Sequence, residues 1–394
     1  MGGIFGDVKV LDFTNNLAGP VATLMLATFG AEVIKIERPG KGDDSRGFGL
    51  RIDGVSVFYM AHNRGKKSLA LDTKKPEAVA ILRKLVSKVD VVVESFRPGV
   101  IDKMGFGYEE LKKINPSIIM CSVSAFGQTG PYSQWPGYDI IAQGVSGIMS
   151  VTGAGDGPPT KVGPSIGDYV TGFNAFGAIA GALYYRAKSG KGQYIDTCLV
   201  DCLIAANDYA DYAFNGFEVK RTGNHHGLFA PYGVYNGNGG NIIIGILNQK
   251  LWNTLCVIMN HPEMMDNPKY DDPGKRRQVL PEIIGAIEPW LKSFPDIDEP
   301  FRILKEKGIP CTKVYTLPDL LTDPHILSRQ MVTDMDVPYL KSGKMKTKGI
   351  QIKFAENPGV LGSPPQVGEH QKEILNMIGY GDKEIQALKE KGVF

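Results

Sequence analysis

The sequence has little cysteine, almost no net charge and no long apolar run, and each of these absences excludes a class of function. Its 394 residues include five cysteines, which lack the spacing of metal ligands, so reduced thiols in a cytosolic protein are expected. The 44 basic and 42 acidic residues leave a net charge of +2, too little for a field that attracts nucleic acid or an anionic membrane. No apolar stretch approaches the length that crosses a bilayer.

Several functional motifs are also missing. No Gly-x-Gly-x-x-Gly follows the first predicted strand, and the chain has no Gly-Lys-Ser/Thr phosphate loop, so a dinucleotide or nucleoside-triphosphate enzyme is not expected. His225 and His226 are neighbours, but no carboxylate or thiolate lies beside them, and no metal site is predicted. The first residues lack the basic and apolar segments of a signal peptide, which favours a cytoplasmic location.

The N-terminal part alternates between strands and helices. Residues 8–13 and 32–37 read as strands around a helix at 21–30, and further predicted strands follow at 68–71, 91–93 and 118–123, with helices at 76–89 and 105–113 between them. Repeated strand–helix–strand units predict a parallel sheet in an open, doubly wound α/β domain. In such domains ligands bind at the carboxyl ends of the strands.

The composition changes in the middle of the chain. A segment rich in glycine and asparagine separates residues 232–235 from 242–245, which predicts a hairpin, and helical patterns follow it. We therefore expect a large α/β domain over 1–224, a smaller α+β domain over 225–310, and a segment over 311–394 that returns to the large domain.

Basic residues follow several of the predicted strands, in loops at 15–20, 38–43, 95–99 and 127–131. Because parallel strands end at one edge of a sheet, Arg38, Lys41 and Arg97 would lie close enough together to bind phosphate. Arginine and lysine are also common in solvent-facing loops that bind nothing. The pattern therefore leaves open whether these residues bind phosphate or are only exposed to solvent.

Asp168 precedes a run of small and apolar residues, 171–185, that predicts a buried helix. An aspartate at a helix start can simply cap the free backbone N–H groups. It can also attack an activated acyl group, because a carboxylate and a thioester give a reactive anhydride. The residue before it, Gly167, would leave room for a ligand to approach.

A series of motifs along the whole chain carries a resemblance to a known family. The motifs are Ala31-Glu-Val-Ile-Lys-Ile-Glu-Arg-Pro-Gly40, residues 63–72, 95–107, 127–131, 137–139, 155–159, 167–168, 221–224, 230–232, 308–311 and 368–370. In this order they closely resemble the family III CoA-transferases, whose members include formyl-CoA, carnitine and bile-acid CoA-transferases and whose relatives include acyl-CoA racemases. The resemblance is specific for the family and not for the acids used.

The resemblance implies a large open doubly wound α/β domain built from both chain ends, a smaller α+β domain, and an interlocked homodimer. It implies no tightly bound cofactor: coenzyme A and acyl-CoA are substrates, and a small carboxylic acid is the other partner. Asp168 matches the family's nucleophile. It would attack the donor thioester to give an anhydride, CoA would then form a thioester with the enzyme, and the acceptor acid would complete the exchange.

The resemblance also implies which residues contact CoA and which lie beside the nucleophile. The implied CoA contacts are Asn16 and Ala18 in one loop, Arg38 at a phosphate, Leu71 and Lys74 at the adenosine end, and Ser95, Phe96, Arg97 and Lys103 along the pantetheine and phosphates. Tyr138 and Asp139 fall beside Asp168, with Asp139 as a supporting acid.

Two departures from the family patterns bear on the reaction. The racemases have a histidine where this chain has Tyr138, and a phenol titrates about three pH units too high to exchange an α-proton in its place. Racemization of an acyl-CoA is therefore the alternative function. Formyl-CoA transferase has a glutamine where Leu17 stands, which argues against oxalate or formate and favours a larger or less polar acid.

Overall fold

The computed structural model describes residues 3–394, so the first two residues, on which part of the signal-peptide argument rests, lie outside it. The chain forms two compact units. The first contains the chain up to residue 146 together with 163–207 and 323–394, and the second contains 147–162 and 208–322. The first unit thus includes both ends of the chain. Residues 208–224 and 311–322 belong to the second unit, so its limits differ from the expected 225 and 310.

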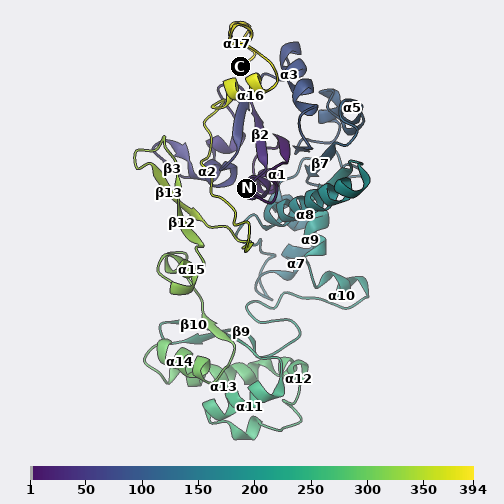
Figure 1. The fold of residues 1–394 in the computed structure, drawn as a ribbon. Coiled ribbons are helices and arrows are strands. Elements are labelled where there is room, and N and C mark those ends of the chain that lie inside the picture. Colours follow the sequence, from purple (N-terminus) through teal and green to yellow (C-terminus); the bar gives the residue numbers. More distant parts are fainter. Residues whose placement is uncertain (1–2) are drawn as a thin grey trace. The chain divides into compact units, whose positions relative to one another are not determined.

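A six-stranded parallel sheet is the centre of the first unit (Figure 1). Its strands are β1 (Lys9–Phe13), β2 (Glu32–Glu37), β5 (Lys67–Ala70), β6 (Val91–Glu94), β7 (Ile119–Ser124) and β8 (Tyr194–Cys198), in the order β5-β2-β1-β6-β7-β8. Every neighbouring pair is parallel, as predicted from the alternating pattern. The direction in which successive strands are added reverses between β1 and β6, and such a switch point is where open α/β sheets bind ligands.

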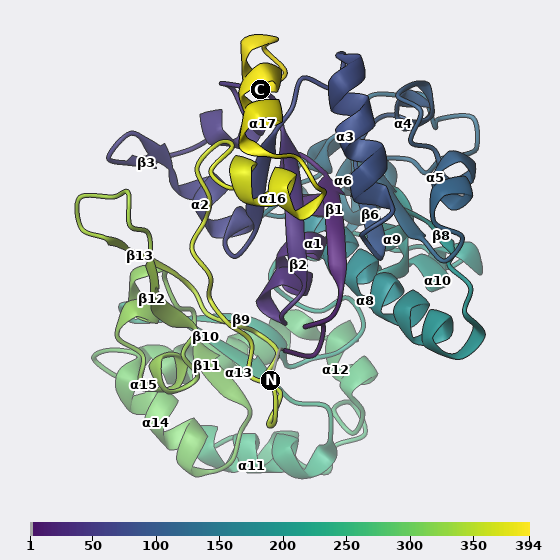
Figure 2. The same ribbon diagram turned by 45° about the horizontal axis from the view of Figure 1, so that its top comes forward.

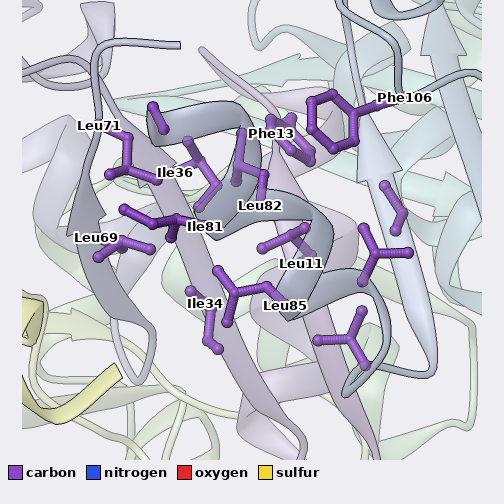
Figure 3. Close-up of a cluster of buried hydrophobic side chains, with 14 of the residues drawn as sticks. Leu11, Phe13, Ile34, Ile36, Leu69, Leu71, Ile81, Leu82, Leu85 and Phe106 are labelled. Atoms are coloured by element: carbon purple, nitrogen blue, oxygen red, sulfur yellow. The ribbon is translucent and has the colours of Figure 1, made fainter. Parts of the chain in front are cut away.

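One face of this sheet is covered by an apolar cluster. Ile81 and Leu85 of α3 (Pro76–Val86) lie over Leu11 and Ile34 of the strands (Figure 3). Side chains of the C-terminal helices α16 (Gln371–Met377) and α17 (Asp382–Glu390), which are labelled in Figure 2, complete the cluster. Helix α16 packs against β5. Burying these aliphatic side chains, at roughly 25 cal/mol per Å² of apolar surface, fixes the sheet from which the loops of the site extend.

The opposite face of the sheet carries buried charges. Successive strand residues point to opposite faces, so Asp12 and Lys35 lie away from the apolar cluster, under α1 (Ala18–Thr28). Thr23 of α1 donates a hydrogen bond to Asp12 at 2.7 Å. Helix α8 (Ile166–Ser189) packs closely on α1 at Gly172, where a Cβ would lie 2.7 Å from a backbone oxygen of α1.

The remaining elements of the first unit are mostly short. They are η1 (Asp44–Gly47), β3 (Arg51–Ile52), β4 (Val55–Ser56), α2 (Val57–Asn63), α4 (Val100–Lys103), α5 (Tyr108–Ile114), α6 (Asp139–Val145), α9 (Leu199–Ala205), α15 (Pro324–Ser328), β12 (Val332–Asp336) and β13 (Lys344–Lys348). The helix expected over 105–113 was wrong in its bounds, because Gly105 adopts φ = 81° and separates α4 from α5.

The second unit is an antiparallel sheet with helices. Its strands β9 (Tyr232–Gly237), β10 (Gly240–Gly245) and β11 (Cys311–Lys313) confirm the predicted hairpin. The helices are α7 (Ile148–Val151), α10 (Ala210–Phe214), α11 (Gln249–Met259), α12 (Pro273–Gln278), α13 (Leu280–Lys292) and α14 (Asp298–Glu306), with 3-10 turns η2 (Pro262–Met264) and η3 (Pro318–Leu321). Trp252 and Ile244 are central in its apolar core. Across residues 3–394, no helix is both long and apolar enough to span a membrane.

Candidate active site at the start of helix α8

Asp168 lies in the first turn of α8, and a second aspartate holds that turn in place. Asp139, at the start of α6, accepts hydrogen bonds through Oδ1 from the backbone N–H groups of Gly167 at 2.7 Å and Asp168 at 3.3 Å. Its Oδ2 accepts a 2.6 Å bond from Gln143. A carboxylate in this position satisfies the free N–H groups of a helix start and interacts favourably with its dipole.

The space beside Gly167 is filled by protein, so the expectation that it leaves room for a ligand is wrong. A Cβ at this position would lie 3.0 Å from both Asp139 Oδ1 and a methyl of Leu203. Glycine is needed here because α6 and α9 approach the first turn of α8 closely.

Asp168 does not have the geometry of a helix cap. The N-cap position is Ser165, and α8 begins at Ile166, before the apolar run. The Asp168 side chain is half-buried. Among residues 3–394, no group forms an ion pair or a hydrogen bond with its carboxyl group. Burial, reinforced by the charge of Asp139, raises the pKa of Asp168 to about 7. The interpretation of Asp168 as a helix cap is therefore wrong. The helix predicted over 171–185 is present within the 24-residue α8, but it is only partly buried: Tyr184 is 64% exposed.

A pocket of about 200 Å³ lies at the switch point of the sheet. Five residues assigned by the resemblance line it: Asn16, Ser95, Phe96, Arg97 and Tyr138. Tyr138 is 72% exposed and immediately precedes Asp139, the residue that anchors Asp168. The pocket lining therefore includes the residue directly before Asp139, which holds the turn that carries Asp168.

A second pocket, of about 310 Å³, adjoins the ends of β1 and β2. Arg38, Leu71 and Phe96 are among its lining residues, so Phe96 belongs to both pockets. Arg38 forms an ion pair with Asp44, another lining residue, and both side chains are about half exposed. The guanidinium is accessible to an anion that displaces this carboxylate.

The loop after β1 is held from two sides. Ser95 Oγ accepts a 3.0 Å bond from the N–H of Asn15, and Asp43 Oδ1 accepts a 3.3 Å bond from the N–H of Asn16. Asn16 has φ = 68°, a left-handed conformation that asparagine tolerates better than most residues. Its side-chain oxygen is buried and has no hydrogen-bond partner in the part of the chain that the structure describes.

Beneath this loop, buried lysines neutralise buried aspartates. Lys66 Nζ lies 3.1 Å from Asp12, and Lys35 Nζ lies 2.7 Å from Asp43. Burial alone would raise the pKa of Asp12, but Lys66, Lys35 and two threonine hydroxyls lower it to about 2. Lys35 also donates a 2.7 Å bond to the carbonyl of Thr14, so this ionic cluster supports the loop directly.

Three of the expected contact residues lie outside the two pocket linings. Ala18 is 7% exposed within α1, and Lys74 and Lys103 are exposed. Leu17 is 4% exposed and also lies outside both linings, so its effect on the choice of acid stays a prediction. Within the described range, no cluster of histidine, cysteine, aspartate and glutamate side chains could hold a metal ion.

The stretch Gly163-Pro-Ser165-Ile-Gly167 matches the Gly-x-Ser-x-Gly pattern of serine hydrolases, so the expectation that no serine of this chain lies in that pattern is wrong. In those enzymes the serine occupies a sharp turn between a strand and a helix. Here residues 152–164, which lead into Ser165, form no strand, and Ser165 is the N-cap of α8. The pattern therefore lacks the structural context of a nucleophilic serine.

Comparison with known proteins identifies what this architecture resembles. The sequence matches the model of CoA-transferase family III over residues 5–371. It is 37% identical to the succinyl-CoA:glutarate CoA-transferase of Homo sapiens over 98% of this chain and 89% of that protein. It is 36% identical to the succinyl-CoA–D-citramalate CoA-transferase of Chloroflexus aurantiacus, over 98% and 97%. A solved CAIB/BAIF family protein from Brucella suis has a TM-score of 0.83 at 33% identity, over 96% of this chain and 100% of that chain.

Proposed function

Because the chain belongs to CoA-transferase family III, we propose that it moves CoA from a dicarboxylic acyl-CoA, such as succinyl-CoA, to a second small dicarboxylic acid through Asp168. The observation that carries the proposal is the half-buried carboxyl of Asp168, which has no cationic partner within residues 3–394. A partly desolvated carboxylate that ionises near neutral pH suits nucleophilic attack. The two curated relatives named above, which pair succinyl-CoA with glutarate or D-citramalate, support the class of acids.

The exchange would take place in successive displacements at acyl carbons. Asp168 Oδ bonds to the thioester carbon of the donor, the C–S bond breaks, and CoA leaves as a thiolate. The thiolate attacks the aspartyl carbon of the anhydride, which releases the donor acid and leaves an Asp168–CoA thioester. The acceptor carboxylate attacks this thioester, and the thiolate released then attacks the acceptor's acyl carbon, which frees Asp168. Excluding water preserves the anhydrides.

The two pockets at the switch point would hold CoA. Arg38 and Leu71 line the pocket assigned to the phosphates and adenosine, and Phe96 and Tyr138 line the one assigned to pantetheine. This assignment is supported by the position of both pockets at the carboxyl ends of β1 and β6. Asp139 would act by orienting the turn that carries Asp168, because its Oδ1 already accepts both bonds from that turn.

A separate cavity of about 170 Å³ suits the distal carboxylate of a dicarboxylic acid. Arg64, Lys348, His62 and Tyr169 line it, and most of its other walls are apolar. Arg64 is only 5% exposed, its Nε has no hydrogen-bond partner, and it forms no ion pair with a carboxylate among residues 3–394. A buried guanidinium without a counter-ion is unfavourable, so an anionic ligand there would gain affinity.

Lys348 and a neutral histidine complete the polar side of this cavity. Lys348 Nζ donates to the Tyr169 hydroxyl at 2.6 Å, and that hydroxyl lies 2.8 Å from His62 Nε2. Burial, together with the charge of Lys348, lowers the pKa of His62 to about 4, so the ring is uncharged at neutral pH. The positive charge of the cavity therefore comes from Arg64 and Lys348.

The proposal is tested by mass spectrometry of the intact protein after addition of succinyl-CoA. An adduct with the mass of CoA less one water, as a thioester requires, is expected on the wild type and absent from Asp168→Asn. Transfer that proceeds at the wild-type rate in Asp168→Asn would contradict the mechanism. In parallel, glutarate should be a far better acceptor than pentanoate, and Arg64→Met should remove that preference.

The alternative, acyl-CoA racemization, is tested separately. Incubation of a chiral 2-methylacyl-CoA in heavy water, without an acceptor acid, would introduce α-deuterium if the protein were an isomerase. We expect no uptake. The interlocked homodimer implied by the resemblance is also a proposal, which light scattering coupled to size-exclusion chromatography checks through the mass of the assembly.

A further inference from the structure

A buried carboxyl, that of Glu94, lies beneath the loop that connects the two pockets, and the transfer steps above do not use it. Glu94 is the last residue of β6 and is 1% exposed. Its Oε2 accepts a 2.7 Å hydrogen bond from the backbone N–H of Phe96. Because Phe96 lines both pockets, one carboxyl oxygen fixes the backbone of the residue that they share.

A chain of hydroxyl groups reaches Glu94 from the neighbouring strands. The Tyr194 hydroxyl on β8 donates a 3.1 Å bond to Ser122 Oγ on β7, and the Ser122 hydroxyl acts to lower the pKa of Glu94. Since Ser122 Oγ accepts from Tyr194, its own proton is directed to Glu94. The Ser122 hydroxyl and the Phe96 N–H therefore both favour the ionised form of the Glu94 carboxyl.

The charged groups that face Glu94 oppose that ionised form. They are Asp102 on α4 and Asp196 on β8, with the neutral side chains of Tyr194 and Cys121 beside them. Burial raises the pKa of Glu94 to about 7 against the bonds from Ser122 and Phe96, and Asp102 and Asp196 add to the increase. A glutamine would accept the bond from the Phe96 N–H without burying a charge. For the stability of the fold, a carboxyl group at this position is therefore less favourable than an amide.

We propose that Glu94 is a positioning residue for CoA: when ionised it holds the loop Ser95–Arg97 in its binding conformation, and when protonated it releases that loop. Protonation removes the negative charge that makes the bond from the Phe96 N–H a strong, charge-assisted one, so the hold of Glu94 on the loop weakens. Ser95 also anchors the N–H of Asn15, so the change extends to the loop after β1. This inference rests on the proposed CoA site.

The experiment measures the Kd of CoA between pH 6 and 8 by calorimetry, with Asp168→Asn as the parent so that the nucleophile's own titration is removed. The parent should bind CoA more weakly as pH falls through 7. Adding Glu94→Gln, which like protonated glutamate is neutral and has one acceptor and one donor group, should give a Kd that is independent of pH and close to the parent's at pH 6. Adding Glu94→Ala should weaken binding roughly tenfold at every pH, the effect of losing a hydrogen bond to a charged group.

A neighbouring substitution sharpens the assignment. Asp102→Asn removes a negative charge that faces Glu94, so the midpoint of the pH dependence should move to lower pH. Its matched control, Glu109→Gln on the exposed side of α5, should leave the midpoint where it is. Thermal unfolding of each variant at pH 8 verifies that it is folded.

The outcomes separate the inference from the proposed function. Equal pH dependence with glutamate and glutamine at position 94 overturns the positioning role. If Phe96→Ala weakens CoA binding while both Glu94 variants bind like the parent, the CoA site stands and only the role of Glu94 fails. If Phe96→Ala leaves the Kd unchanged, the CoA site itself is misplaced.

Discussion

Two regions of the first unit bury carboxyl groups in opposite ways. In the ionic cluster beneath the loop after β1, Asp12 and Asp43 each lie within 3.1 Å of a lysine, and their pKa values fall below the usual range. At Asp168 and Glu94, no cation within residues 3–394 forms an ion pair with the carboxyl, and burial raises each pKa to about 7. The same residue types are thus held ionised in one region and poised between two states in the other.

We propose that this difference separates groups that maintain shape from groups that react or switch. A buried ion pair is destabilising to break, because the partner that remains is a buried charge without compensation. An unpaired carboxyl is unfavourable for the fold, and strongly perturbed pKa values concentrate at functional sites. Substitutions in the ionic cluster should therefore change stability, and substitutions at the unpaired carboxyls should change function while the fold is kept.

The largest effect is expected from Asp168→Asn. Without the nucleophile, the rate of CoA transfer should fall roughly a thousandfold or more, measured by formation of the acceptor's thioester under saturating substrates. The fold should remain, and at pH 8 the variant should be at least as stable as the wild type, since a raised folded-state pKa means that ionised Asp168 is unfavourable above pH 7. A variant that unfolds would place Asp168 with the structural groups instead.

The next largest effect is expected from Asp12→Asn, which leaves Lys66 buried without its counter-ion. We expect a loss of about 3–5 kcal/mol in the free energy of unfolding, measured with urea at pH 7. The double variant Asp12→Asn/Lys66→Met removes both charges and should recover much of that loss. If the double variant is as unstable as the single one, the pair itself does not explain the destabilisation.

Short-range sequence patterns were enough to predict the order of strands and helices in the first unit, but they did not predict which charged side chains are buried. Strand, helix and strand recur at regular spacing, so the parallel sheet and its ligand-binding edge could be predicted. In Val33-Ile-Lys-Ile-Glu37, by contrast, Lys35 has the pattern of a solvent-facing residue, and only the packing of α1 and the position of Asp43, eight residues later, explain why it is fully buried. Charge pairing depends on tertiary contacts that local sequence does not contain.

The candidate site shows the same division. Motifs indicated Asp168 and most of the pocket residues, because these are short, specific strings. Glu94 and Arg64 were not predicted as functional residues. What distinguishes them is the lack of an ion-pair partner among residues 3–394, or neighbours far along the chain such as Ser122, and local sequence shows neither. The first turn of α8 was also misjudged: nothing in residues 163–166 distinguishes a loop from a helix start, and the bond from Gly167 to Asp139 spans 28 positions.

A smaller effect is expected in the pH profile of transfer. Asp168 must be ionised to attack, so kcat/KM should fall about tenfold per pH unit well below 7 and level off above it. The charge of Asp139 helps to raise the pKa of Asp168, so Asp139→Asn should move the midpoint to lower pH, whatever it does to the maximal rate. Steady-state rates from pH 5 to 9 provide this check, and an unchanged midpoint in Asp139→Asn would remove the electrostatic link between the two aspartates.

The smallest effect, and the sharpest contrast with the ionic cluster, is expected for the stability of Glu94→Gln. A folded-state pKa of about 7 lies above the ordinary 4.5, so stability from neutral Glu94 is fully present below pH 4.5 and lost as pH rises through 7. Glutamine stays neutral, and the variant should exceed the wild type by about 1–3 kcal/mol at pH 8 while matching it near pH 5. Urea unfolding at the two pH values measures the difference. A gain of the same size at both would mean that glutamine packs better than glutamate, with no contribution from the charge.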